Sequence, residues 1–250
     1  MTAQDLFDKI RNARYCTALT GAGVSTLSGI RDFRGKNGLY NESGTEKIFD
    51  IEYFEKDPTL YYRASASFIY NIDEKEPSVV HIVLAKLEKL GMLKAVITQN
   101  IDLLHERAHS SHVIEIHGSP KTHYCLRCAG IRMPFQEAAA AVHAGGHPLC
   151  PECGRILKPA ITFFGESLPI KALQEAVDEA QKSDLMLVLG TSLTVYPAAS
   201  MPDHTLRQGG EIVIVNNQPT HLDNQAVLHF NDLGEVFAEL NNILDTLTGV

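Results

Sequence analysis

The 250-residue sequence lacks any apolar run of about 18 residues, the length that a membrane-spanning helix needs. Residues 1–15 form a charged amphipathic segment without the apolar core of a secretory signal. We therefore expect a cytoplasmic protein that has no membrane partner.

Blocks of like charge are also absent, although the formal net charge is −8. Clustered lysine and arginine usually mark a surface that binds nucleic acid, so we expect no direct nucleic-acid partner. The acidic balance is compatible with basic protein or peptide partners. The length and the hydrophobic content of 44% suffice for one large core, or for a large domain with a small satellite.

Cysteine is scarce, but four of the five cysteines form two C-x2-C pairs. In a reducing cytoplasm, such pairs indicate a metal site rather than disulfides. Four thiolates leave a zinc ion no open position, so we expect a structural zinc site; an iron–sulfur cluster or a redox dithiol is a less favoured alternative. The fifth, Cys16, reads as a small core residue. The proposed zinc ligands are Cys125, Cys128, Cys150 and Cys153.

Short apolar runs alternate with amphipathic helical patterns along much of the chain. Buried strands of a parallel sheet are continuously apolar, as these runs are. Strands that alternate with helices predict an α/β fold built on a parallel sheet. The predicted strands are 15–19, 94–98, 112–116, 185–189, 211–215 and 226–230, and the clearest helical patterns are 77–91, 169–183 and 232–247.

Two segments break this alternation. Residues 36–76, rich in tyrosine and phenylalanine, predict a helical insertion, and residues 121–157 carry the cysteine pairs. The large domain is therefore expected to be discontinuous, built from residues 1–35, 77–120 and 158–250.

Polar clusters follow five of the predicted strands. Ligands of open α/β sheets bind outside the carboxyl ends of the strands, so we expect these clusters to line one crevice. Turn formation alone explains any single cluster, but it explains poorly why Gln99, Asn100, Asp102 and His117 occur together. The clusters are TGAG (20–23), TQNID (98–102), HGSP (117–120), GTS (190–192) and NNQ (216–218).

The first cluster opens like a dinucleotide-binding loop. Gly21 and Gly23 match the start of G-x-G-x-x-G, but Thr26 stands at the third glycine position. The backbone N–H groups of such a loop can hold a pyrophosphate. No apolar strand precedes Glu42 or Glu46 to present the acidic residue that a hydride-transfer dehydrogenase usually has, so that class is disfavoured.

His117 ends a predicted strand within the proposed crevice. Histidine suits general-base work because its pKa lies near neutrality. A structural role is the default for His81, His143 and His229, which lie outside the clusters.

Together these motifs resemble the sirtuin family of NAD-dependent protein deacylases. The match covers nearly the whole chain, because the motifs occur in the family's order. They are GAGVS, GIRDFRG, TQNID, HG, CLRC, CPEC, FFGESLP, GTSLTVYP and IVNN. The resemblance implies a Rossmann-like large domain, a small domain made of a zinc ribbon and a helical module, and a cleft between them where NAD and acyl-lysine meet.

The resemblance also implies site residues. Gln99 would engage the ribose, residues 100–102 would form the nicotinamide pocket, and Ser192, Asn216 and the region near Asp232 would meet the ribose and adenine end. Phe33 could shield the reactive sugar face. The implied NAD-binding set is Gly21, Ala22, Gly23, Thr26, Asp32, Phe33, Arg34, Gln99, Asn100, Ile101, Asp102, His117, Gly190, Thr191, Ser192, Asn216, Asn217 and Asp232.

The family's reaction cleaves the nicotinamide–ribose bond as the acyl-lysine oxygen attacks the sugar. By resemblance, His117 is the base that helps deprotonate a ribose hydroxyl, and Asn100 is the second catalytic residue. Substrate backbone would pair as an extra strand between two edges, a known mode of peptide capture. The implied substrate contacts are Phe164, Gly165, Glu166, Val195 and Tyr196.

The sequence departs from the family pattern at Arg31, where proline is frequent, and at Leu103, where glycine is frequent. Members that prefer succinyl- or malonyl-lysine carry Tyr-x-x-Arg, whereas this chain has Tyr62 and Ser65, with Arg63 two residues before Ser65. We therefore expect a protein-lysine deacetylase with a preference for neutral acyl groups. Removal of other acyl groups, mono-ADP-ribosyl transfer and a non-catalytic NAD-sensing module are the alternatives.

Overall fold

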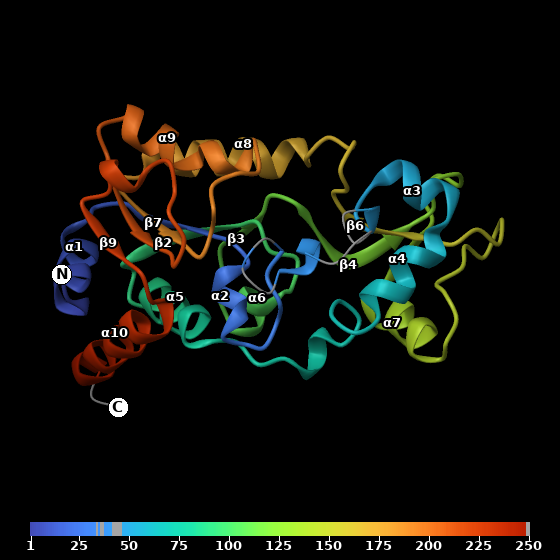
Figure 1. Ribbon diagram of the computed structural model, residues 1–250, viewed down its shortest axis with the longest axis horizontal. Helices are drawn as coiled ribbons and strands as arrows, with labels where there is room; N and C mark the ends of the chain where they lie inside the picture. Colours follow the sequence, from blue (N-terminus) through green and yellow to red (C-terminus); the bar gives the residue numbers. More distant parts are fainter. Residues whose placement is uncertain (34, 36–37, 42–46, 249–250) are drawn as a thin grey trace.

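A large parallel sheet stands at one end of the molecule, and a smaller unit with its own sheet at the other (Figure 1). The computed structural model describes residues 1–33, 35, 38–41 and 47–248. Both described ends of the chain lie beside the large sheet (Figure 1).

The large sheet has six strands in the order β3-β2-β1-β7-β8-β9, and each neighbouring pair is parallel. All six predicted strands are present, with ends that differ from the prediction by at most two residues. The central strands β1 and β7 are buried along their whole length, which explains their continuous apolar sequence. The strands are β1 Cys16–Thr20, β2 Leu93–Thr98, β3 Val113–Glu115, β7 Leu185–Leu189, β8 Glu211–Val215 and β9 Leu228–Phe230.

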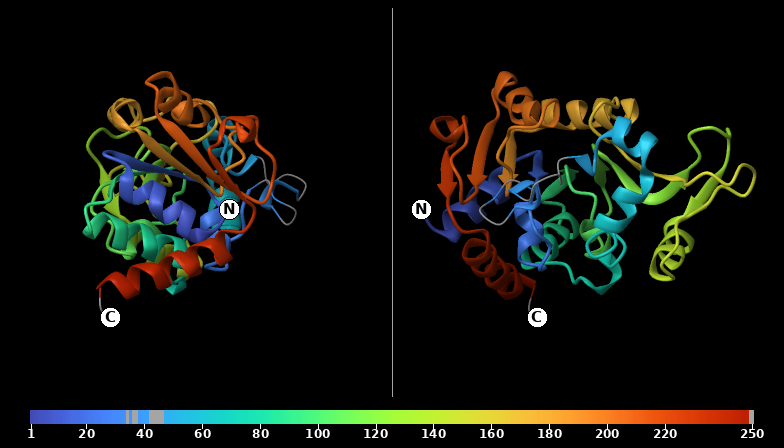
Figure 2. Two further views of the ribbon diagram at one scale, coloured as in Figure 1. Left: turned by 90° about the vertical axis from the view of Figure 1, so that its left-hand side faces the viewer. Right: turned by 45° about the vertical axis from the view of Figure 1, so that its right-hand side comes forward.

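Helices cover both faces of this sheet (Figure 2). On one face lie α1 (Ala3–Asn12), α5 (Val79–Lys89) and α10 (Leu233–Thr248), and on the other α8 (Ile170–Lys182) and α9 (Met201–Arg207). Each fully buried aliphatic side chain in these layers contributes about 1.5–3 kcal/mol. The three predicted helices are α5, α8 and α10.

The strand order reverses between β1 and β7. From β1 the chain proceeds to β2 and β3 on one side, and from β7 to β8 and β9 on the other. The loops that follow β1 and β7 therefore diverge and leave a crevice at the carboxyl edge, the usual ligand position in such sheets.

The smaller unit is a three-stranded antiparallel sheet with helices against it. Its strands were not predicted as strands from the sequence. They are β4 Gly118–Tyr124, β5 Arg132–Pro134 and β6 Lys158–Ile161, in the order β5-β4-β6. β4 begins before the predicted cysteine module 121–157, and β6 follows directly after it. The exact domain boundaries remain a prediction.

Aromatic side chains form the core of this unit. Tyr61 packs edge-to-face on Phe54, and Tyr70 stacks on Phe135, so the two insertions share one core. The helices involved are α3 Ile51–Lys56, α4 Pro58–Ser65 and α7 Phe135–His143. The other short helices of the described residues are α2 Gly23–Thr26, α6 Leu104–Arg107, η1 Leu39–Asn41, η3 Ile72–Glu74, η4 Ala198–Ser200 and η5 Asp223–Gln225.

Within the described residues, the helices are all too short or too polar to cross a bilayer.

Candidate active site

A cavity of about 760 Å³ opens at the carboxyl edge of the large sheet. This volume falls within the roughly 300–1,000 Å³ typical of small-molecule sites. Residues from all five predicted polar clusters line it, together with residues 161–168 of the segment after β6. The fold therefore brings together loops that are far apart in the sequence.

The loops after β1 and β7 meet backbone to backbone. The N–H of Gly23 donates to the carbonyl of Gly190 over 2.9 Å, and that of Gly21 to the carbonyl of Leu189 over 3.0 Å. A Cβ on Gly21 would come within 2.7 Å of the Gly190 oxygen, and one on Gly23 within 2.7 Å of the Gly190 Cα. Only glycine permits this approach, which sets the floor of the cavity.

Asn100 lines the cavity, and hydrogen bonds hold its side-chain amide in place. Its Nδ2 atom donates to the carbonyl of Gly21 over 3.1 Å and lies 3.2 Å from Ser25 Oγ. The Gly21 oxygen only accepts, so the amide nitrogen must face it. The hydrogen bonds thus fix the orientation of the amide.

Asp102 lies behind this amide and does not line the cavity. Ser25 Oγ donates to Asp102 Oδ2 over 2.5 Å, and the N–H of Leu104 donates to Oδ1 over 3.0 Å. Burial raises the pKa of Asp102, against the effect of these two hydrogen bonds. Asp102 therefore supports Asn100 through Ser25, a residue to which the sequence analysis assigned no role although it ends the GAGVS motif.

His117 lies at the junction between the two sheets, directly before β4. Its Nδ1 atom is 2.9 Å from the carbonyl oxygen of Gln99. A carbonyl accepts only, so Nδ1 carries the proton and Nε2 is the basic nitrogen of the neutral ring. The carbonyl of His117 accepts from the N–H of Thr162 over 2.8 Å, which ties the residue to the segment after β6.

Aromatic side chains form another wall of the cavity. Phe33 packs against Tyr40 and Phe49 at ring centroid distances of 5.4 and 5.9 Å. Phe164 joins this wall by two backbone hydrogen bonds, donating to Phe49 and accepting from Ile51. Tyr62 and Ser65 are buried in the aromatic core and Arg63 is exposed, and all three lie away from the cavity lining.

The structure places most of the predicted site residues on the cavity. Arg34 lies outside the described residues, and Asp102 lies behind the wall. The residues on the lining are Gly21, Ala22, Gly23, Thr26, Asp32, Phe33, Gln99, Asn100, Ile101, His117, Phe164, Gly165, Glu166, Gly190, Thr191, Ser192, Val195, Tyr196, Asn216, Asn217 and Asp232.

Sequence reasoning missed other lining residues. Tyr40 and Phe49 belong to the segment that was recognised only as rich in aromatic residues, and that richness was the available signal. Ile161 lies two residues before the FFGESLP motif, and Phe163 is the first residue of that motif, but neither was assigned a role because neither carries a polar group. The remaining additions include Leu27, Thr162, Leu168, Ile170, Pro197 and Asn231.

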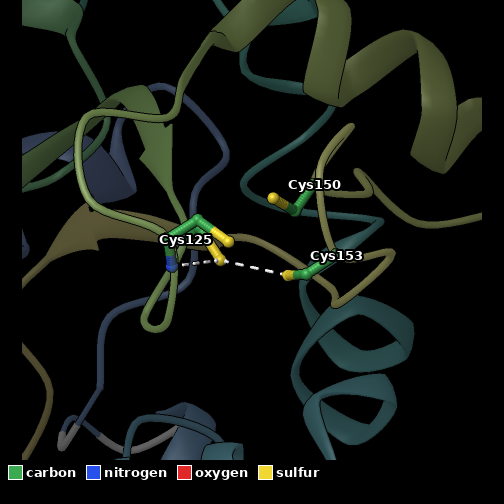
Figure 3. A group of neighbouring side chains, drawn as sticks. Cys125, Cys150 and Cys153 are labelled. Atoms are coloured by element: carbon green, nitrogen blue, oxygen red, sulfur yellow. Dashed lines mark hydrogen bonds between the residues drawn. The ribbon is translucent and has the colours of Figure 1, made fainter.

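The four paired cysteines cluster in the smaller unit. Their sulfur atoms all lie within 4.8 Å of one another, and Cys125 Sγ is 3.7 Å from Cys153 Sγ. Figure 3 shows the side chains of Cys125, Cys150 and Cys153 directed toward one another. Zinc–sulfur bonds of about 2.3 Å in a tetrahedron place sulfurs about 3.8 Å apart, so the cluster fits a zinc ion.

Backbone hydrogen bonds favour the thiolate form of one cysteine of the cluster. The N–H groups of Cys128 and Arg127 donate to Cys125 Sγ over 3.2 and 3.4 Å. These bonds lower the pKa of Cys125 to about 7, which favours the thiolate that a metal needs. Burial raises the pKa of Cys16, which lies in β1 outside the cluster.

Comparison with known proteins identifies the family. The model of the Sir2 family matches residues 21–197, more than half of the chain. The chain belongs to the Sir2 family. It is 43% identical over 231 residues to an NAD-dependent protein deacetylase of Thermotoga maritima, covering 92% of this chain and 93% of the relative.

Solved Sir2 structures share the fold. A Sir2 complex with a p53 peptide and NAD⁺ superposes with a TM-score of 0.89 at 40% identity, and all of both chains is covered. A Sir2 variant with a deacetylated p53 peptide and 3′-O-acetyl-ADP-ribose superposes with a TM-score of 0.90 at 41% identity, covering 98% of each chain.

The two departures from the Sir2 pattern have visible consequences. Arg31 Nη2 donates to the carbonyl of Gly38 over 3.4 Å. Leu103 adopts the left-handed conformation, with φ 59° and ψ 8°, directly before α6. Glycine takes this conformation without strain, whereas leucine does not, so the fold retains a backbone shape that glycine would suit better.

Proposed function

We propose that this chain is an NAD-dependent protein-lysine deacetylase, which transfers the acetyl group of acetyl-lysine to ADP-ribose and releases nicotinamide. The observation that carries the proposal is His117, whose Nδ1 is committed to the Gln99 carbonyl on the same cavity as the glycine loop. Relatives that carry the deacetylase name, and Sir2 complexes with peptide and NAD⁺, support it.

The residues of the cavity fit NAD as a co-substrate. We assign the phosphates of NAD to the backbone of the loop 21–23, which lines the cavity and leads into α2. We assign the nicotinamide end to Asn100 and Ile101, and the adenine end to Asn216 and Asp232, as the resemblance implies.

When bound, NAD supplies both the bond that breaks and the acceptor of the acyl group. His117 Nε2 takes a proton from a ribose hydroxyl, because the Gln99 carbonyl holds the ring in the tautomer with a basic Nε2. The aromatic wall of Phe33, Tyr40 and Phe49 excludes water from the reacting sugar.

Peptide substrates enter along the wall opposite the glycine loop. The side chains of Phe164 and Tyr196 line the cavity and are 46% and 64% exposed, which leaves apolar surface for the acyl-lysine side chain and its neighbours. Acyl-lysine proteins or peptides are thus the proposed partners.

The proposed acyl group is neutral. The charged residues among the described lining are Asp32, Glu166 and Asp232, and that lining contains no lysine or arginine to pair with an acyl carboxylate. We expect faster turnover of acetyl-lysine than of succinyl-lysine in matched peptides. Faster removal of succinyl would overturn this preference.

The four cysteines hold a structural zinc ion, as their spacing and fit indicate. Such thiolates persist in a reducing compartment, so we place the protein in the cytoplasm.

Mass spectrometry of an acetyl-lysine peptide incubated with and without NAD tests the proposed function. Deacetylated peptide, nicotinamide and acetyl-ADP-ribose should appear together and only with NAD. Nicotinamide without deacetylation would indicate NAD hydrolysis, and a peptide carrying ADP-ribose would indicate the transferase alternative.

A further inference from the structure

Lys158, the first residue of β6, has a side chain that is 0% exposed. A buried ammonium is stable only when its donors are satisfied. Its Nζ atom lies 2.8 Å from Glu166 Oε2, and donates to the carbonyls of Ile161 over 2.7 Å and Pro159 over 3.2 Å. Three acceptors thus meet the three donors of the ammonium group.

Aromatic rings enclose the same charge. Nζ lies 4.1 Å from the centroid of the Phe163 ring and 5.5 Å from that of Tyr124. Both distances allow a cation–π interaction. Burial lowers the pKa of Lys158, and the Glu166 carboxylate opposes this effect.

The contacts of Lys158 cross-link a bend in the chain between residues 161 and 166. Glu166 Oε2 accepts from the N–H of Phe163 over 2.7 Å, and the N–H of Glu166 donates to the carbonyl of Phe163 over 3.0 Å. The Glu166 carboxylate is therefore turned toward Lys158 and the backbone, although the residue borders the cavity.

The bend is also joined to the proposed catalytic residue. Thr162, in its first half, donates its N–H to the carbonyl of His117. Phe163, Phe164 and Gly165 from the same bend line the cavity. The buried Lys158 ammonium thus holds a segment that is hydrogen-bonded to the proposed base, His117, and that carries residues proposed to contact the peptide.

We propose that Lys158 is a positioning residue for the acyl-peptide, acting through Glu166 and the bend 161–166. This inference rests on the proposed deacetylase function. It also assigns Glu166 a different role. Glu166 supports the segment that contacts the substrate rather than contacting the substrate itself.

Steady-state kinetics of Lys158→Met test the proposal. Methionine keeps an unbranched apolar side chain, one atom shorter than lysine, and removes the charge and all three hydrogen bonds. We expect KM for an acetyl-lysine peptide to rise about tenfold or more, and KM for NAD to stay within about twofold. Lys158→Arg, which keeps the cation, should recover part of the peptide affinity.

Lys86→Met is the matched control. Lys86 pairs with Asp245 and donates to Asn241 on α10, on the opposite side of the sheet from α8 and outside the cavity lining. This variant also loses a lysine–carboxylate ion pair, at a partly exposed position, and its KM for the peptide should stay within about twofold of the wild type.

A second variant separates positioning from folding. Lys158→Met alone leaves the Glu166 carboxylate half-buried without its cation, so Lys158→Met/Glu166→Gln restores neutrality. The double variant should regain thermal stability but keep the raised peptide KM, because the cross-link is still absent. A peptide KM equal to that of the wild type in either variant, or an equal rise in both KM values, would overturn the proposal. A wild-type protein without deacetylase activity would instead overturn the proposed function.

Discussion

The Nδ1 atom of His117 lies 2.9 Å from the backbone carbonyl oxygen of Gln99, a residue that directly follows strand β2. The Gln99 carbonyl, a backbone group, thus fixes the position of the ring and the tautomer that this proposed base adopts when neutral. The carbonyl, unlike a carboxylate, does not titrate, so the acceptor offered to Nδ1 is the same at every pH.

His117→Ala should lower kcat by about 10²–10⁴-fold, the usual contribution of general-base catalysis. NAD binding measured by calorimetry should change little, because the cavity walls remain. His143→Ala, at an exposed histidine outside the cavity, serves as the control. Deacetylation by His117→Ala at the wild-type rate would remove His117 from the catalytic assignment.

Asn100→Asp should raise KM for NAD about tenfold and cost about 1–3 kcal/mol of stability. The new carboxylate would face the Gly21 carbonyl, where the amide now donates. It would also stand next to Ser25, whose hydroxyl already serves Asp102. Asn242→Asp makes the same change on an exposed position of α10 and should alter neither quantity. Unchanged NAD kinetics in Asn100→Asp would contradict the role of the amide.

Leu103→Gly should be about 0.5–1 kcal/mol more stable than Leu103→Ala, because only glycine relieves the left-handed backbone. Alanine removes the same side-chain contacts and keeps the strain, so the comparison isolates the backbone. In α10 the order should reverse, with Ala238→Gly less stable than the wild type by about 1 kcal/mol. Urea unfolding measures both differences, and equal stability of the two Leu103 variants would argue against strain at this residue.

His81 and His105 form a buried pair behind the glycine loop, with ring centroids 4.6 Å apart. Burial lowers the pKa of His81 to about 4, and burial followed by the charge of His81 lowers that of His105. The fold thus prefers both rings neutral. Their contribution to stability is complete above about pH 6.5 and is lost as the pH falls from there through 4.

Between pH 7 and pH 5, the His81 ring alone should cost the wild type about 2 kcal/mol of unfolding free energy. His81→Gln should lose correspondingly less over the same interval, since glutamine does not titrate. His221→Gln, at an exposed histidine, should follow the wild-type slope. Parallel slopes for His81→Gln and the wild type would mean that the buried ring does not titrate in this range.

Cys150→Ser should abolish the stoichiometric zinc and lower Tm by roughly 10 °C, because the smaller unit depends on the metal for part of its stability. Cys16→Ala should keep one zinc per chain, since Cys16 lies outside the cluster. Metal analysis and thermal unfolding measure both effects. Retention of zinc by Cys150→Ser would show that this cysteine is not a ligand.

The sequence predicted the large sheet well because its strands are buried on both faces. Runs such as 185–189 and 211–215 are apolar throughout, and the polar residues that follow them mark the carboxyl edge. The strands of the smaller sheet gave no such signal. β4 mixes polar and apolar residues, β5 has only three residues, and the other partner, β6, lies beyond the second cysteine pair.

The sequence also gave no sign of contacts between side chains that lie far apart along the chain. The sequence places Asp102 next to Asn100, but only the fold shows that Ser25 turns Asp102 into a support. Lysine is usually exposed, so no pattern marked Lys158 as buried. Such pairs depend on three-dimensional packing rather than on local periodicity.

The close contact of Gly21 and Gly23 with Gly190 makes one wall of the cavity from tightly packed backbone, unlike the aromatic wall. On the glycine side, backbone meets backbone, and there is no room for even one added methyl group. On the aromatic side, the surface consists of side chains that can be exchanged for others of different size. Redesign of acyl or peptide selectivity should therefore begin at Tyr40, Phe49 or Ile170 and leave the glycines untouched.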